Sequence, residues 1–248
     1  QYFGEDGDDH FRSGYLMLET LDGGIGIDLV NTSSTDAAYL IDLTTGATNY
    51  AAKSFLNFEN VVTGGGDDTI HGNAAANTIT TGLGNDVVNG NDGADSILGE
   101  DGNDTLSAGT GADTIRGGNG SDLILSSGDG AYYGDGGDDV IRIGGNGSAE
   151  YLDGGAGRDT ISLVNIAGNH QIDMTTGIAG VSLGTTRSIL NFEQLDMGAG
   201  DDTVTGTVNA DAIDGGDGDD SLSGMAGGDT LRGNLGNDIL LGGDDIDL

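Results

Sequence analysis

The chain has 248 residues, of which 50 are glycine, and it contains no proline, cysteine or tryptophan. Its 42 acidic and 7 basic side chains give a formal net charge of −35, which excludes the Lys/Arg patches that nucleic acids and anionic membranes require. No apolar run approaches the roughly 20 residues of a membrane-spanning helix, so we expect neither nucleic-acid binding nor membrane insertion.

Glycine content and charge both oppose folding of this chain. Glycine loses more conformational freedom on folding than any other residue, and like charges repel one another in a compact state. A disordered acidic chain is therefore one alternative. Against it, the 35% of hydrophobic residues recur with a strict period. We expect a fold that needs a bound cation and is largely lost without one.

The period comes from a nine-residue repeat, and the first 62 residues contain few copies of it. Residues 1–12 contain one isolated copy, Gly4–Arg12, and are interpreted as the end of a preceding repeat block. Residues 13–62 are richer in β-branched and aromatic residues, which predicts longer strands in connector coils. Gly23–Asn31 fits the repeat formally, but we assign it to a connector strand.

Residues 63–162 form the first repeat block, and residues 63–125 divide into seven consecutive nine-residue repeats, or nonads. The eighth position is always aliphatic. The fifth position alternates between polar and small residues, as expected if two nonads make one coil. Further copies place Asp139 and Asp159 at the sixth position, whereas Ala131 and Ala149 replace the acid elsewhere. In the seven nonads the sixth position reads Asp68, Asn77, Asp86, Asp95, Asp104, Asp113 and Asp122.

A second connector, 163–196, precedes a second, truncated repeat block, 197–248. The connectors resemble each other: Ile41–Gly46 echoes Ile172–Gly177, and Leu56–Glu59 echoes Leu190–Glu193. The chain is therefore a duplicated unit of connector plus repeat block, and we expect all zones to form one continuous solenoid. The sixth positions of the second block are Asp202, Asp211, Asp220, Asp229, Asp238 and Asp247.

The nonad reads G-G-x-G-x-D-x-U-x, where U is aliphatic. The residues x-U-x can form a short strand with U pointing inward, and the six other residues turn the chain. Glycine accepts backbone angles that direct carbonyl groups toward one point, and the aspartate adds carboxylate oxygens. Such an all-oxygen shell suits calcium, which takes 6–8 oxygen ligands. Zinc or copper is poorly supplied, because the chain has no cysteine and only 3 histidines.

Gly117–Leu125 and Gly154–Ser162 match this pattern in full. The pattern resembles the RTX, or haemolysin-type, calcium-binding nonapeptide repeat, and the resemblance covers well over half of the chain. It implies an all-β fold, a right-handed parallel β-roll (β-solenoid), here with two wider strand-rich connector zones. It also implies export by type I secretion and an extracellular or cell-surface location.

With two nonads per coil, residue i lies above residue i+18, and an ion can sit between successive turns. This stacking pairs the sixth positions of nonads that lie one coil apart, which gives roughly nine calcium (Ca²⁺) sites. Nine divalent ions would about halve the net charge. The alternative is that the aspartates only shape turns. The predicted metal ligands are Asp68, Asn77, Asp86, Asp95, Asp104, Asp113, Asp122, Asp139, Asp159, Asp202, Asp211, Asp220, Asp229, Asp238 and Asp247.

Catalytic motifs are not supported by the sequence. Gly180–Gly184 fits G-x-S-x-G, but no histidine follows His170 and the segment falls in a connector strand. There is no H-E-x-x-H motif. We therefore expect no enzyme activity.

Two functions remain open at this point. The first is a calcium-rigidified structural module of an adhesin, surface layer or extracellular filament, with possible end-to-end self-association. The second is the non-catalytic carrier or secretion region of a type I-secreted hydrolase whose active site lies outside this chain. Because Leu248 interrupts a nonad, we expect a fragment of something longer that lacks the family's C-terminal export signal.

Overall fold

The computed structural model describes residues 1–13, 19–50, 52–144, 150–181 and 185–248. Within these ranges all regular elements are β-strands, and they contain no helix that could cross a membrane. The chain divides into two compact units, Gln1–Ile124 and Leu125–Leu248. The Ser182–Gly184 part of the G-x-S-x-G match and Ala149 lie outside the described residues.

The first unit is built from two sheets. One has the strand order β1-β3-β7-β6-β5-β9-β11-β13, and the other β2-β4-β8-β10-β12-β14. The strands are β1 (Tyr2–Phe3), β2 (His10–Arg12), β3 (Glu19–Asp22), β4 (Leu29–Asn31), β5 (Leu40–Asp42), β6 (Ala47–Thr48), β7 (Lys53–Leu56), β8 (Asn60–Val62), β9 (Thr69–His71), β10 (Thr78–Leu83), β11 (Val87–Asn89), β12 (Ser96–Asp101), β13 (Thr105–Ser107) and β14 (Asp113–Asn119).

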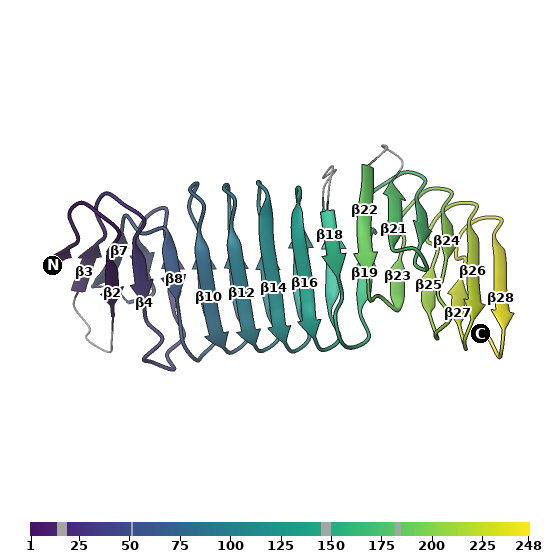
Figure 1. Cartoon of the computed structure of the whole chain (residues 1–248), viewed down its shortest axis with the longest axis horizontal. Coiled ribbons are helices and arrows are strands. Elements are labelled where there is room, and N and C mark those ends of the chain that lie inside the picture. Colours follow the sequence, from purple (N-terminus) through teal and green to yellow (C-terminus); the bar gives the residue numbers. More distant parts are fainter. Residues whose placement is uncertain (14–18, 51, 145–149, 182–184) are drawn as a thin grey trace. The chain divides into compact units, whose positions relative to one another are not determined.

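Parallel pairing in the first repeat block follows the predicted eighteen-residue step. Ile79 pairs with Ile97, and Ile97 with Ile115, so that β10, β12 and β14 lie side by side (Figure 1). All three isoleucines are at most 1% exposed, because alternate residues of a strand point to opposite faces. The expected all-β parallel solenoid is thus confirmed.

The second unit repeats this architecture. Its sheets run β17-β19-β23-β25-β27 and β16-β18-β22-β21-β20-β24-β26-β28. The strands are β15 (Leu123–Ser126), which begins at the boundary between the units, β16 (Gly130–Gly136), β17 (Val140–Ile143), β18 (Glu150–Asp153), β19 (Thr160–Ser162), β20 (Gln171–Asp173), β21 (Ile178–Val181), β22 (Thr185–Leu190), β23 (Gln194–Asp196), β24 (Thr203–Thr205), β25 (Ala212–Asp214), β26 (Ser221–Ala226), β27 (Thr230–Arg232) and β28 (Ile239–Asp244).

The connectors are not simply wider parallel coils, because each contains an antiparallel excursion. β6 pairs antiparallel with β5 and β7, and β21 pairs antiparallel with β20 and β22. The shared D-x-T-T-G sequence explains the turn: Asp42 Oδ1 accepts the N–H groups of Thr44 and Thr45, at 2.9 and 3.0 Å. Gly46 then closes the turn with a φ of 70°. The five zones drawn from the sequence, and their joining into one solenoid, stay predictions.

Candidate metal centre

The sixth position of each nonad in the two blocks lies two residues before an aliphatic residue, which is buried except on the last coil, at the point where the turn enters the strand. We call the rows of these residues on successive coils the acid ladders. Asp86 Oδ1 accepts the backbone N–H of Asp68 at 2.7 Å, and Asp104 Oδ1 accepts that of Asp86 at 2.8 Å. Each ladder carboxylate thereby fixes the neighbouring coil in register.

The same bond joins all nine predicted pairs, at 2.7 to 3.1 Å. It also joins Asp139 and Asp159, although these lie 20 residues apart. The structure therefore brings together every pair that the sequence placed one coil apart. Ligation of metal by these residues stays a prediction.

The second carboxylate oxygen of most ladder residues is buried without a hydrogen bond. A buried carboxylate without compensation is costly, and such oxygens are rare in folded proteins. A cation between each pair of coils would compensate the buried oxygens that border it, so the residues present fit calcium ions. This Oδ2 atom is buried and accepts no hydrogen bond in Asp68, Asp86, Asp95, Asp104, Asp113, Asp159, Asp202, Asp220 and Asp229.

Where a nonad opens with glycine, that residue leaves room in front of this oxygen, whereas Thr63, Thr81, Ala108 and Met197 stand at this position in other nonads. A Cβ on Gly99 would collide with Oδ2 of Asp104 and with the carbonyl oxygen of Gly117 on the next coil. A carboxylate oxygen and a carbonyl oxygen therefore border the same small space, which the missing Cβ of Gly99 keeps open. This mixture of oxygen types is the one that calcium prefers.

Burial also changes the acidity of the ladders. It raises the pKa of Asp104 to about 7 and the pKa values of Asp68 and Asp95 to about 6. It raises the pKa of Asp159 and of Asp202 to about 6 as well. Near neutral pH these carboxylates are therefore costly to keep charged in the folded chain, and a cation between them would remove that cost.

Side chains alone do not complete the metal shell. Within the described ranges, no group of three or more His, Cys, Asp or Glu side chains lies close enough to hold a metal ion. Calcium needs 6–8 ligands, so most of them would come from backbone carbonyls of the glycine turns.

Two of the predicted ligands are already engaged by neighbouring groups. The amide of Asn77 donates to the carbonyl oxygen of Glu59 at 2.7 Å. Asp211 Oδ2 accepts the N–H and the hydroxyl of Thr207, at 2.6 and 3.0 Å. These two residues are therefore the weakest members of the predicted set inside the stacks. Asp238 and Asp247, on the last coils, are half-exposed.

Among the ladder members that the structure adds to the predicted ligands are Asp9, Asp28, Glu59 and Glu193. Asp28 Oδ1 accepts the N–H of Asp9 at 2.7 Å, and Glu59 Oε2 accepts that of Asp28 at 2.9 Å. Glu193 Oε2 accepts the N–H of Asp159 at 2.9 Å. The nine-residue spacing from Glu59 to Asp68 was the available signal.

Three assignments are corrected by this register. Gly23–Asn31 is a true nonad, because Asp28 joins the ladder and Val30 is fully buried. Leu152 is the buried residue of its coil, so the acid position there is Glu150 and not Ala149. Tyr132 is likewise buried, which places Gly130, not Ala131, at the acid position of that coil.

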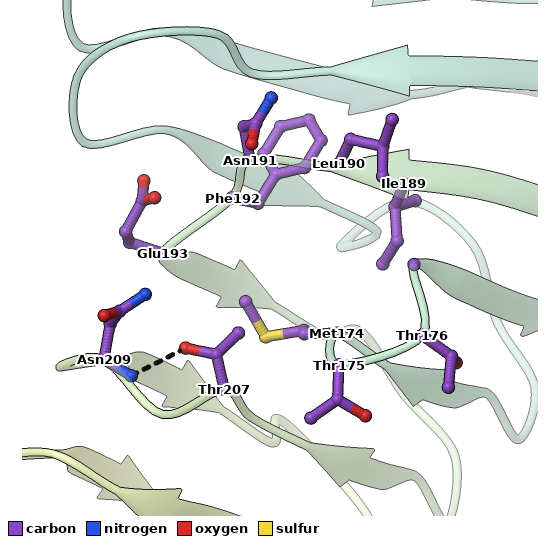
Figure 2. A pocket seen from close by; sticks show the side chains of 11 residues that line it. Met174, Thr175, Thr176, Ile189, Leu190, Asn191, Phe192, Glu193, Thr207 and Asn209 are labelled. Atoms are coloured by element: carbon purple, nitrogen blue, oxygen red, sulfur yellow. Dashed lines mark hydrogen bonds between the residues drawn. The ribbon is translucent and has the colours of Figure 1, made fainter.

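A separate hollow of about 280 Å³ lies beside the second connector (Figure 2). The backbone N–H of Asn209 donates to Thr207 Oγ1 at 3.0 Å across one side of it. Only one lining side chain is titratable, so the hollow contains no pair of groups for acid–base chemistry. The hollow is lined by Met174, Thr175, Thr176, Gly177, Ile189, Leu190, Asn191, Phe192, Glu193, Thr207 and Asn209.

Fold and site together define a class: a β-roll whose stacked coils present buried carboxylates to one another. The family model of the RTX calcium-binding nonapeptide repeat (4 copies) matches residues 62–97, 89–124, 98–131, 144–162, 198–231 and 214–248, together more than half of the chain. The chain therefore belongs to the RTX calcium-binding repeat family. No curated protein matches it.

Proposed function

We propose that this chain is a structural module that folds when it meets extracellular calcium, in a secreted or cell-surface bacterial protein. An adhesin, a surface layer or an extracellular filament would use such a module as a stiff rod. The observation that carries the proposal is the row of buried, unbonded Oδ2 atoms along the ladders. That row is costly without cations and stabilising with them.

The net charge of −35 supports a link between calcium and folding. Because the metal shell forms only when two coils stack, the free energy of binding adds directly to the free energy of folding. Extracellular calcium modules bind at roughly 10⁻⁴–10⁻³ M. At the low calcium of a cytoplasm the ladders would repel one another, and the chain would stay unfolded and suitable for export.

We also propose that the chain has no enzyme activity. This rests on the sequence, which offers no complete catalytic motif, and on the single titratable group in the hollow beside the second connector. The alternative is that the chain is the carrier region of a type I-secreted hydrolase. In that case activity would be confined to another domain of the parent protein.

Circular dichroism during a calcium titration tests the central proposal, with magnesium as the matched control. We expect the β signal to rise cooperatively with calcium and to change little with magnesium, which demands strict octahedral geometry. A flat calcium titration would contradict the proposal. Electron microscopy tests the role as an extracellular filament. Filaments that form with calcium and disappear when a chelator is added would favour that role.

A further inference from the structure

Two residues without a carboxyl group interrupt the acid ladder in the described part of the first connector: Tyr39, whose N–H donates to Asp68 Oδ1 at 2.6 Å, and Lys53. Glu19 on β3 and Lys53 on β7 are register partners on neighbouring strands. Each lies two residues before a buried residue of the core, Leu21 and Phe55, so both occupy ladder positions. A lysine therefore stands where a repeat would place an aspartate.

The second connector is interrupted in the same way. Tyr151 on β18 pairs with Ser188 on β22, so the preceding residues, Glu150 and Arg187, face each other. Both stand two residues before a buried core residue, and they are only 3% and 1% exposed. Because the chain has only 7 basic residues, the burial of a cation at the same position of both connectors is a specific feature.

Each cation lies against the ladder carboxylate beside it. Lys53 Nζ is 3.5 Å from Glu19 Oε1, and it donates to the hydroxyl of Ser13 at 2.9 Å. The same hydroxyl donates to Glu19, and the ring centroids of Tyr39 and Tyr50 lie 5.4 and 5.5 Å from Nζ. Lys53 is thus enclosed by groups that favour a positive charge.

Arg187 is held similarly in the second unit. Its Nε donates to Glu150 Oε2, and the hydroxyl of Ser126 lies beside the same carboxylate. Ser126 comes two residues after the buried Ile124, and Ser13 two residues after Phe11. In several nonads this is the position of a glycine whose missing Cβ leaves a space, as at Gly99. Ser13 and Ser126 place a hydroxyl there, as Thr63 and Thr81 do in the first repeat block.

We infer that Lys53 and Arg187 act as built-in cations, each replacing calcium between one pair of coils, so that every unit holds one coil contact that closes without metal. A side chain is present at any calcium concentration, whereas an ion must be captured from solution. These contacts therefore form first, and calcium-driven stacking proceeds from the connectors. The inference rests on the proposed calcium-dependent folding of the ladders.

Hydrogen–deuterium exchange of the full chain at graded calcium concentrations tests the order of folding. Peptides over β3 and β7, and over β18 and β22, should become protected at a calcium concentration on the order of tenfold lower than peptides over β11, β13, β25 and β27. Equal midpoints would overturn the inference. If the ladder peptides ignored calcium altogether, the proposed function would fail instead.

Variants test the role of the charge. Lys53→Met should raise the calcium midpoint of the first connector, while the second connector, with Arg187 intact, serves as the internal control. Lys53→Arg, which copies the second unit, should keep the midpoint near that of the parent chain. The double variant Glu19→Gln/Lys53→Met removes both charges and should recover much of the loss.

Calcium stoichiometry distinguishes the inference from an ordinary metal site. Glu19→Gln should leave the number of bound calcium ions unchanged in equilibrium dialysis, because its carboxylate partners Lys53. Asp86→Asn, the matched change inside a ladder, should lower that number. A lost calcium ion in Glu19→Gln would overturn the inference, whatever the folding behaviour of the lysine variants.

Discussion

The repeat blocks and the connectors differ in how they accommodate buried carboxylates between coils. In the blocks, glycine turns leave a space between coils, and most ladder carboxylates have one buried oxygen that accepts no hydrogen bond, as at Asp104. In the connectors, antiparallel excursions and aromatic contacts widen the core, as where the Phe55 and Phe58 rings meet edge to face at 6.4 Å. There the buried charge is offset by a side chain. The comparison shows that a basic side chain can offset a buried carboxylate between two coils, and we propose that a metal ion does so in the repeat blocks.

The largest expected difference between the regions concerns acid in the metal-free chain. The folded-state pKa values of Asp68, Asp95 and Asp104 are about 6, 6 and 7, against an ordinary value of 3.8. A raised folded pKa adds stability that is fully present below about pH 4 and is lost as the pH rises through 6 to 7.

We therefore expect the chain, kept free of calcium by a chelator, to gain β-sheet signal when the pH is lowered from 7.5 to 4, mainly in the repeat blocks. Circular dichroism with hydrogen exchange measures this by region. In calcium the trend reverses, because protons displace the metal below about pH 6. A chelated chain equally unfolded at both pH values would contradict the explanation by burial.

The next largest effect is expected from Asp95→Ala/Asp104→Ala. Each residue belongs to two vertical pairs, so the change removes one carboxylate from four predicted sites. It also removes the two bonds that these carboxylates accept, from the N–H groups of Asn77 and Asp86. Isothermal titration calorimetry should show several sites weakened together, with the connectors unchanged. Asp101→Ala is the control, because that carboxylate is exposed and lies outside the ladder. Unchanged stoichiometry in the double variant would count against the eighteen-residue pairing.

A smaller, local effect is expected from Gly99→Ala. The new methyl would fill the space between Asp104 Oδ2 and the Gly117 carbonyl, and overpacking of this kind costs about 1–3 kcal/mol. The loss of one metal site should accompany it. Gly228→Ala is the matched control, because the nearest atom to its Cβ is 3.3 Å away. Chemical denaturation in the presence of calcium measures the free energy of unfolding of both variants. Equal values would contradict the claim that Gly99 keeps a metal space open.

The smallest effect is expected in a connector turn. Asp173 accepts hydrogen bonds from Thr175 and Thr176, and the bond from the Thr175 hydroxyl is the main cause that lowers the pKa of this carboxyl. Asp173→Ala should lower stability by about 0.5–1.5 kcal/mol and leave the calcium midpoint of the ladders where it was. A shifted ladder midpoint would show that hairpin and metal sites are coupled.

Much of the candidate site could be predicted from the sequence, because it rests on a period. Asp86 and Asp104 lie 18 residues apart in the sequence, and in the structure Asp104 Oδ1 accepts the backbone N–H of Asp86 at 2.8 Å. The connectors have no such period. Asp28 meets Glu59 at a separation of 31 residues, and Asp159 meets Glu193 at 34. No local rule predicts those separations, so Glu59 and Glu193 were left out of the predicted ligand set.

The amino-acid sequence by itself determined the β-roll, its coil length and the type of cation. Glycine, aspartate and an inward aliphatic residue recur at fixed intervals, and in a solenoid residues one interval apart lie at equivalent positions of successive coils. Only the tertiary structure decided which charges face one another where that interval breaks. Glu19 meets Lys53 because the chain forms β5 and β6 first and then returns to pair β7 with β3. Glu150 meets Arg187 in the same way, because β20 and β21 precede the pairing of β22 with β18. Such pairing depends on the order of the strands in the sheet, which the folded backbone reveals and the nine-residue period does not.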